Sequence, residues 1–240
     1  MHVFVDLPAE QYRAGLDFWS AATGWQPSRP WADHPEFVSL QPASGTPYVH
    51  LQRIDGPARI HVDLVVAEVE ATRDRLAALG AATGDRHPWW QVMASPGGLP
   101  FCLVAEREAL EVPPASIWPT GHRSRVAQLS VAVPDALHDD ELRFWEAATG
   151  WRLDAAGPAH MPHLLPVEPA ALQILVQRLG PEDNSSATRA HIDFGTDEIP
   201  TEVIRLQTLG AELIDDSHLP RWVVMRDPAG LLLCVTRQRP

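Results

Sequence analysis

The sequence has little cysteine, little positive charge and no long apolar stretch. Its 240 residues include two cysteines, Cys102 and Cys234, which are too few and too far apart for a disulfide framework or a CxxC motif. Lysine and arginine total 19 against 31 aspartates and glutamates, and the net charge of −12 argues against nucleic acid and anionic membranes as partners. No apolar run reaches the roughly 18 residues of a membrane span, and no signal-peptide pattern opens the chain. We therefore expect a cytoplasmic protein.

The motifs of several enzyme classes are also missing. No glycine-rich phosphate loop of the GxGxxG or P-loop type follows a predicted strand, which removes the usual signals of nucleotide binding. No GxSxG nucleophile motif is present. Cys102 and His61 could in principle form a thiolate–imidazole pair, but the apolar surroundings of Cys102 disfavour an activated thiol.

What the sequence does contain is a tandem repeat. The nine residues FWSAATGWQ at 18–26 return as FWEAATGWR at 144–152, with seven identities. LAALGA at 76–81 returns as LQTLGA at 206–211, and MASPGGLPFC at 93–102 returns as MRDPAGLLLC at 225–234. A long period that is present only twice indicates two domains and not a solenoid.

The repeats divide the chain into residues 1–106 and 125–240, joined by a proline-rich linker at 107–124. Hydrophobic periodicity predicts the same order in each repeat: a strand, a helix and short strands, followed by another strand, another helix and two or three closing strands. Strands with few helices indicate an α+β fold with mixed sheets, built from four βαβββ modules. The predicted helices lie near 9–22, 69–79, 137–148 and 199–209, with glycines just past their ends. Trp118 in the linker is expected to pack back on a domain.

These motifs resemble the glyoxalase-like members of the vicinal oxygen chelate superfamily, which includes bleomycin-resistance proteins, glyoxalases and dioxygenases. The resemblance rests on the FW…TGW helix end, the His-x-Asp strand before a helix that ends in LG, and the final strand after Asp227-Pro228. It covers both repeats and implies tandem cupped sheets, each made of two βαβββ modules. It also implies that the repeats pack as an intramolecular pseudo-dimer, and a homodimer of the whole chain stays open.

In enzymes of this superfamily each cup holds a divalent metal. The resemblance places the first-strand ligand at His2 and Gln128, and the fifth-strand ligand at His61 and His191. The fourth strand offers His50 or Gln52 in the first repeat and Gln173 or Gln177 in the second. The last-strand glutamate of the superfamily is replaced by Cys102 and Cys234.

This replacement leaves two interpretations of the cysteines open. His2, His61 and Cys102 could form a zinc-type site, since zinc accepts imidazole and thiolate ligands; iron, manganese and nickel stay open as well. Asp63 and Asp193 each follow a histidine by two residues, so they share its strand face and could replace a ligand or support one. The other interpretation is that both cysteines are small buried hydrophobes.

Unpaired aromatic residues are candidates for ligand binding. Trp31 and Trp89 have no counterpart in the second repeat, whereas Trp19 and Trp145 recur and should serve the fold. Aromatic rings in a cup could stack on a flat ligand. The candidate ligand-binding residues are Trp31, His50, Gln52, His61, Asp63, Trp89, His191 and Asp193.

Three functions follow as hypotheses. The first is binding of a small aromatic or oxygen-rich molecule in a cup that lacks the complete metal triad and needs no cofactor. The second is a metal-dependent lyase, isomerase or extradiol-type dioxygenase that uses His2 and His61. The third is a scaffold or regulatory protein whose cups are filled by side chains. The sequence assigns no catalytic residue.

Overall fold

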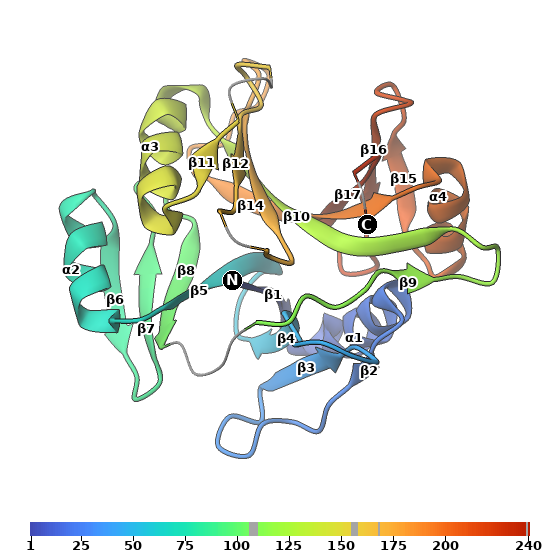
Figure 1. Cartoon of the computed structure of the whole chain (residues 1–240), viewed down its shortest axis with the longest axis horizontal. Coiled ribbons are helices and arrows are strands. Elements are labelled where there is room, and N and C mark those ends of the chain that lie inside the picture. Colours follow the sequence, from blue (N-terminus) through green and yellow to red (C-terminus); the bar gives the residue numbers. More distant parts are fainter. Residues whose placement is uncertain (106–109, 155–157, 168, 239) are drawn as a thin grey trace. The chain divides into compact units, whose positions relative to one another are not determined.

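The structure is a computed structural model that describes residues 1–105, 110–154, 158–167, 169–238 and 240. Each repeat follows the predicted order of strands and helices, which Figure 1 shows along the chain. The first repeat contains β1 (His2–Pro8), α1 (Ala9–Thr23), β2 (Gln26–Pro27), β3 (Phe37–Gln41), β4 (Val49–Ile54), β5 (Arg59–Val66), α2 (Val69–Ala78), β6 (Ala82–Arg86), β7 (Trp90–Ala94) and β8 (Pro100–Ala105).

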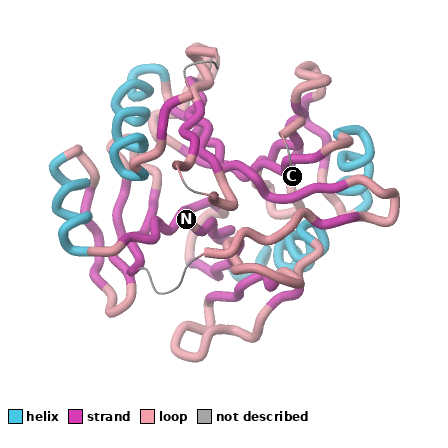
Figure 2. The backbone as a smooth tube through the Cα atoms, viewed as in Figure 1, coloured by secondary structure: helices cyan, strands magenta, loops and turns pink. Residues whose placement is uncertain are grey.

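The second repeat follows the short strand β9 (Ser116–Ile117). It contains β10 (Arg123–Val133), the 3-10 helix η1 (Asp135–Leu137), α3 (His138–Thr149), β11 (Arg152–Leu153), β12 (His163–Leu165), β13 (Gln173–Arg178), β14 (Arg189–Thr196), α4 (Ile199–Thr208), β15 (Glu212–Asp215), β16 (Trp222–Arg226) and β17 (Leu232–Thr236). Strands and loops make up most of the chain (Figure 2). The predicted α+β class and the four βαβββ modules are confirmed. No helix in the described part of the chain is long and apolar enough to cross a membrane.

Each repeat builds one mixed sheet. The strand order is β2-β3-β4-β1-β5-β8-β7-β6 in the first and β11-β12-β13-β10-β14-β17-β16-β15 in the second, where β9 also pairs with β10. The pairs β5–β8 and β14–β17 are parallel. Each pair is connected through a helix and two antiparallel strands, since parallel strands need a crossover connection. In each repeat, a histidine, an aspartate and a cysteine lie on this parallel pair of strands.

Contacts group the residues into two compact units, and both units draw on both repeats. One comprises Met1–Val3, His61–Leu110 and Leu129–Ala190, and the other comprises Phe4–Ile60, Glu111–Gln128 and His191–Pro240. The division along the sequence into 1–106, 107–124 and 125–240 stays a prediction, as does the packing of the repeats as a pseudo-dimer.

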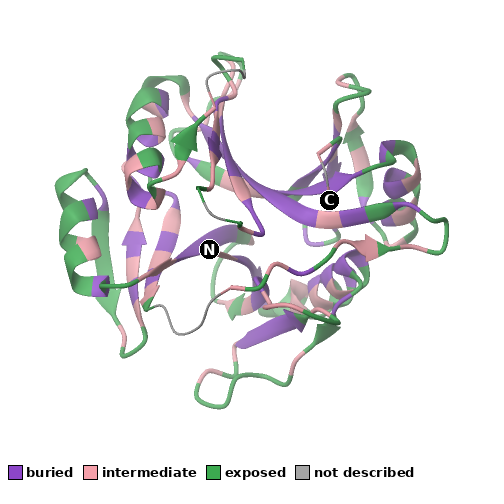
Figure 3. Ribbon diagram, viewed as in Figure 1, coloured by how far each residue is buried: buried purple, intermediate pink, exposed green. Residues whose placement is uncertain are grey.

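Aromatic residues, including the tryptophans that recur in both repeats, pack in the core of each unit. In the first unit, Phe101 packs against Phe144 and Trp145 with ring centroids 5.7 and 5.6 Å apart. In the second unit, Trp19 stacks on Phe194 at 6.0 Å. Trp19 and Trp145 are fully buried, as expected of the tryptophans that recur. Figure 3 shows the same pattern in the ribbon, with buried strands and helices whose outer faces are exposed.

Glycine ends α1 and α3 as predicted. Gly24 and Gly150 adopt left-handed conformations, with φ of 74° and 67°, and their N–H groups donate to the carbonyls of Ser20 and Glu146. This conformation is strained for residues that carry a Cβ atom, which explains glycine at both positions.

One expectation about local structure needs correction. Leu79, predicted to belong to the apolar stripe of its helix, lies just past the end of α2 at Ala78 and is 45% exposed. Within the predicted linker, the short strand β9 pairs with the start of β10 around a turn at Gly121. The stretch at 106–109 lies outside the described residues.

Candidate metal centres

The second repeat brings a histidine, an aspartate and a cysteine together on two neighbouring strands. His191 and Asp193 are two residues apart in β14 and therefore share one face of that strand. Cys234 in β17 is the register partner of Asp193. The Nε2 atom of His191 lies 3.4 Å from the Cys234 sulfur and 3.3 Å from Oδ1 of Asp193. Parallel pairing of the two strands thus produces the cluster.

The three groups converge on one point and do not form a catalytic triad. In a nucleophile–histidine–acid triad, the two ring nitrogens face the nucleophile and the acid separately. Here a single nitrogen of His191 faces both Cys234 and Asp193. Burial, together with the negative charge of Asp193, raises the pKa of the Cys234 thiol well above its ordinary value. Without a positive ion nearby, the thiol therefore stays protonated and is a poor nucleophile.

The Asp193 carboxylate is also hydrogen-bonded on the side that faces away from His191. Its second oxygen, Oδ2, accepts a hydrogen bond from the side-chain amide of Gln128 in β10. The Gln128 carbonyl oxygen in turn accepts a 2.5 Å hydrogen bond from the amide of Gln238. Gln128 is buried. This chain of amides orients Asp193 so that Oδ1 faces the histidine and the cysteine.

The first repeat has the same arrangement at equivalent positions. His61 and Asp63 lie in β5, and Cys102 in β8 is the register partner of Asp63. The His61 Nε2 atom is 3.7 Å from Oδ1 of Asp63. One ligand atom from each of the three residues lies within 4.8 Å of the others, as in the second repeat. His61 and Asp63 are buried, and Cys102 is partly exposed.

His2 does not join this group. Among the described residues, the groups of candidate ligands are His61, Asp63 and Cys102, and His191, Asp193 and Cys234. Burial lowers the pKa of His2 to about 4, so its imidazole is neutral at physiological pH. The strand β1 that carries it lies beside β5 in the sheet. Of the predicted trio, the structure thus gathers His61 and Cys102 around Asp63, and a role for His2 stays a prediction.

The spacing of these atoms suits a tetrahedral ion. Zinc bonds of about 2.0 Å to nitrogen or oxygen and about 2.3 Å to sulfur set two nitrogen or oxygen ligands roughly 3.3 Å apart, and a nitrogen and a sulfur ligand roughly 3.5 Å apart. In the second repeat, the separations of 3.3 Å between His191 and Asp193 and 3.4 Å between His191 and Cys234 are close to these values. In the first repeat, the 3.7 Å between His61 and Asp63 is wider, so these two side chains would have to move closer together around an ion. Imidazole, carboxylate and thiolate are all ligands that zinc accepts, so the donor set fits a divalent ion of this class.

A separate aromatic cluster surrounds Trp31. Its indole N–H donates to the Ser39 hydroxyl at 3.1 Å, and His50 Nδ1 lies 2.9 Å from the same hydroxyl. The His50 ring stacks on Phe4 at 4.7 Å, and Phe37 packs against Trp31 at 5.0 Å. Trp31 is 36% exposed, while His50 is buried. The structure therefore groups two of the predicted ligand-binding residues, with only the indole open to solvent.

The other two predicted ligand-binding residues lie in different places. Gln52 borders the aromatic cluster, because it is partly exposed in β4 and its register partner is Phe37. Trp89 precedes β7 and is 57% exposed. Neither is a member of the His/Asp/Cys groups.

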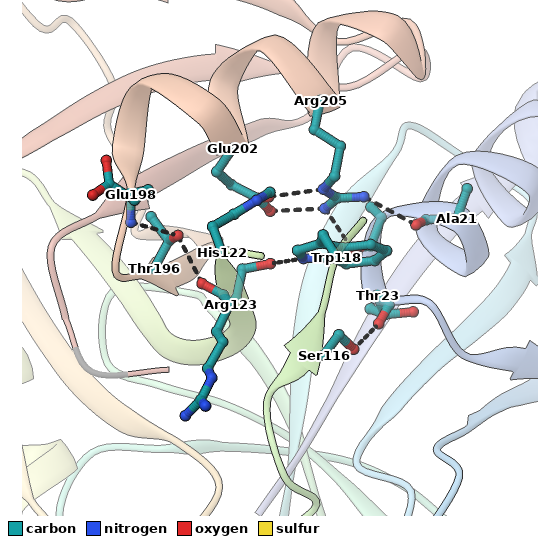
Figure 4. A network of polar contacts seen from close by, with 12 residues as sticks. Ala21, Thr23, Ser116, Trp118, His122, Arg123, Thr196, Glu198, Glu202 and Arg205 are labelled. Carbon is teal, nitrogen blue, oxygen red and sulfur yellow. Dashed lines mark hydrogen bonds and ion pairs between the residues drawn. The ribbon is translucent and has the colours of Figure 1, made fainter. Parts of the chain in front are cut away.

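A buried polar network that the sequence did not reveal links the predicted linker to α4 (Figure 4). Arg205 binds both oxygens of Glu202 at 2.7 Å, and Glu202 also contacts His122 at 2.8 Å. The Arg205 guanidinium lies 3.5 Å from the centroid of Trp118, which confirms that Trp118 packs back on a domain. The residues of this network are distant in sequence, so no local motif predicts their contacts.

Comparisons with known proteins agree with this architecture. The sequence profile of the glyoxalase-like domain matches residues 2–104 and 130–236. No curated protein has a significantly similar sequence. The Mn(II)-bound glyoxalase from Novosphingobium aromaticivorans superposes with a TM-score of 0.71 at 18% identity, covering 99% of this chain and 81% of that one.

Two dioxygenases are similar as well. The 2,2',3-trihydroxybiphenyl 1,2-dioxygenase from Sphingomonas wittichii strain RW1 has a TM-score of 0.63 at 11% identity, covering 98% of this chain and 88% of that one. The 2,3-dioxygenase LapB from Pseudomonas sp. KL28 has a TM-score of 0.63 at 14% identity, with coverage of 98% and 90%. At these identities the similarity shows a shared fold. With the profile matched in both repeats, the chain belongs to the glyoxalase-like domain family of the vicinal oxygen chelate superfamily.

Proposed function

We propose that each repeat binds one divalent ion of the zinc class and that a small oxygen-bearing molecule completes the coordination. His61, Asp63 and Cys102 would hold the ion in the first repeat, and His191, Asp193 and Cys234 in the second. The observation that carries the proposal is the convergence at His191, whose one ring nitrogen faces both the sulfur and the carboxylate oxygen. A structural neighbour described as a Mn(II)-bound glyoxalase adds support.

The replacement of glutamate by cysteine favours zinc over the other divalent ions. A thiolate is a softer ligand than a carboxylate and suits zinc better than manganese. The carboxylate is supplied by Asp63 or Asp193 on the neighbouring strand, so its position within the donor set has changed although its chemistry is retained. Three protein ligands leave one tetrahedral position for a ligand from solution.

The chemistry that such an ion supplies is polarisation of a carbonyl or hydroxyl oxygen. Zinc has no redox chemistry, so this proposal favours a lyase or isomerase of the glyoxalase type over an oxygen-dependent dioxygenase. The protein residues would keep the ligands aligned: Gln128 orients Asp193, and burial excludes competing water around Asp63 and His61.

A second candidate is metal-free binding of an aromatic or oxygen-rich molecule. The aromatic cluster favours it, because Trp31 is partly exposed while its indole N–H is fixed by Ser39. An ordered, partly exposed indole offers a stacking surface at little cost in side-chain entropy. Tryptophan fluorescence titrations with planar aromatic acids in the presence of a chelator test this candidate. They should show saturable quenching that is lost in Trp31→Leu, and an absence of quenching would exclude it.

The metal proposal is tested by reconstitution. Chelator-treated protein is incubated with zinc chloride, freed of excess ion by gel filtration and analysed by plasma mass spectrometry. We expect two ions per chain for the wild type, one for His61→Ala or His191→Ala, and none for the double variant. His218→Ala is the matched control, because His218 is about half exposed and belongs to neither cluster, and it should retain two ions.

Circular dichroism and thermal unfolding of each variant separate loss of an ion from loss of the fold. Sub-stoichiometric zinc in the folded wild type would overturn the metal proposal. Full retention of zinc by the folded double variant would show that the ion binds elsewhere and would overturn the assignment of ligands.

A further inference from the structure

The two candidate metal centres differ in how their aspartates are held. In the second repeat, Asp193 directs Oδ1 toward His191 and Oδ2 toward Gln128. The residue that occupies the position of Gln128 in the first repeat is His2, which cannot make the same amide contacts. The amide contacts that Gln128 makes with Asp193 and Gln238 therefore have no equivalent from His2 in the first repeat.

The direction of the amides follows from the carboxylate. An ionised aspartate only accepts hydrogen bonds, so Gln128 must present its N–H group to Asp193. Its carbonyl oxygen then faces Gln238, which presents its own N–H group at 2.5 Å. Gln128 is buried, so an uncovered carbonyl oxygen at this position would be costly. In this series of hydrogen bonds, donation from Gln238 to Gln128 also polarises the Gln128 amide and strengthens its donation to Asp193.

We propose that Gln238 is a positioning residue for the second centre. It covers the Gln128 carbonyl oxygen and thereby fixes Gln128 as a hydrogen-bond donor to Asp193. Gln128 consequently does not ligate the ion, because turning its oxygen toward the cluster would break two hydrogen bonds. The second centre is then a three-residue His/Asp/Cys site with an ordered carboxylate. This inference rests on the proposed metal binding.

The expected size of the effect follows from other metal sites. Loss of a residue that orients a ligand commonly reduces metal affinity about 10- to 100-fold. Gln238→Met removes the donor and retains a side chain of similar length, so we expect a loss in that range at the second centre alone. Gln207→Met is the matched control, since Gln207 is exposed on α4 and should leave the affinity unchanged.

The experiment uses the full chain with His61→Ala as background, so that only the second centre binds. Zinc affinity is measured by competition with a chromophoric chelator for the background, for Gln238→Met, for Gln128→Met and for both changes together. If Gln238 acts through Gln128, Gln238→Met has no further effect once Gln128 is replaced. Equal losses in both backgrounds, or no loss in the single variant, would overturn the proposal.

A metal-free measurement separates this inference from the proposed function. The side-chain NH₂ protons of Gln128 are followed by ¹H–¹⁵N NMR in the chelator-treated protein. Gln238→Met should shift these signals and accelerate their exchange with solvent, whereas Gln207→Met should not. Unchanged signals would refute the role of Gln238 even if zinc binds. Absence of zinc binding in the background, together with shifted signals, would overturn the metal proposal and limit the role of Gln238 to ordering Asp193.

Discussion

Trp145 donates a 2.6 Å hydrogen bond to Glu141, a fully buried carboxylate one turn earlier in the same helix. The other oxygen of Glu141 accepts from the Ser95 hydroxyl at 2.6 Å and from the backbone of Gly97. The repeat counterpart of Trp145 is Trp19, which donates to Asp227 at 2.9 Å. Asp227 is the repeat counterpart of Ser95, so the buried acid comes from the helix in one case and from the loop in the other.

The residue at the position equivalent to Glu141 explains why the acid of the first repeat does not come from the helix. The counterpart of Glu141 is Gly15, where an added Cβ atom would lie 2.1 Å from a methyl carbon of Leu7. A glutamate at position 15 would therefore clash with Leu7. Both arrangements leave one indole N–H and one carboxylate satisfied, as buried polar groups require.

These acids should make stability depend on pH. Burial raises the pKa of both Glu141 and Asp227 above their ordinary values. The folded state then binds protons to higher pH than the unfolded state, so the free energy of unfolding falls as the pH rises from about 4 through the raised pKa. In Asp227→Asn this contribution is lost. Asparagine offers one acceptor oxygen where aspartate has two, so either the Trp19 N–H or the backbone N–H groups of Ala229 and Leu231 lose an acceptor, at a cost of about 1–3 kcal/mol. Urea unfolding between pH 4 and 7 measures the free energy of unfolding of both proteins. The wild type should exceed the variant by an amount that decreases as the pH rises.

Asp17→Asn is the control for this measurement, since Asp17 is exposed in α1. The free energy of unfolding of Asp17→Asn should differ from that of the wild type by a small and constant amount over the same pH range. If the difference between the wild type and Asp227→Asn instead grows with increasing pH, the pKa of Asp227 is not raised by folding.

Alanine substitutions at Gly24 and Gly150, the glycines that end α1 and α3, distinguish the cost of backbone strain from the cost of a steric clash. A Cβ atom at Gly150 meets nothing within 4 Å, whereas at Gly24 it lies 3.0 Å from the Trp118 ring. Gly150→Ala should cost about 1–2 kcal/mol from the left-handed backbone alone. Gly24→Ala should cost more, because the Trp118 ring must also move. Thermal unfolding of both variants checks the order, and equal costs would show that the ring yields freely.

The Arg205 network should contribute strongly to stability. Glu202 is fully buried, and Arg205→Met removes the guanidinium that binds both of its carboxylate oxygens while the contact with His122 remains (Figure 4). Removing one partner of a buried ion pair typically costs about 3–5 kcal/mol. Arg226→Met breaks an exposed ion pair with Glu212 and should cost about 1 kcal/mol or less. Urea unfolding of the two variants compares them, and similar losses would contradict the importance of burial.

Much of the fold could be predicted because the repeat and the periodicity are local signals. The FW…TGW segment, the glycines after α1 and α3, and the alternation in β5 and β14 each identify an element without reference to the rest of the chain. The exposure of Leu79 could not be predicted this way, since it depends on where the last helical turn ends.

The candidate site was predictable only in part. His61 and Cys102 follow from the motifs, and strand alternation places Asp63 on the same face as His61. That Asp63 and Cys102 are register partners depends on how two strands pair across α2, which no local pattern specifies. Gln238 illustrates the same limit, because its contact with Gln128 joins residues 110 positions apart.

The most direct test of the central claim is X-ray absorption at the zinc edge on the reconstituted wild-type protein. The account predicts a zinc–sulfur distance of about 2.3 Å and zinc–nitrogen or zinc–oxygen distances of about 2.0–2.1 Å, with the sulfur contribution absent in the Cys102→Ser, Cys234→Ser double variant. A spectrum of the wild type that contains only nitrogen and oxygen neighbours would contradict the assignment of Cys102 and Cys234 as ligands.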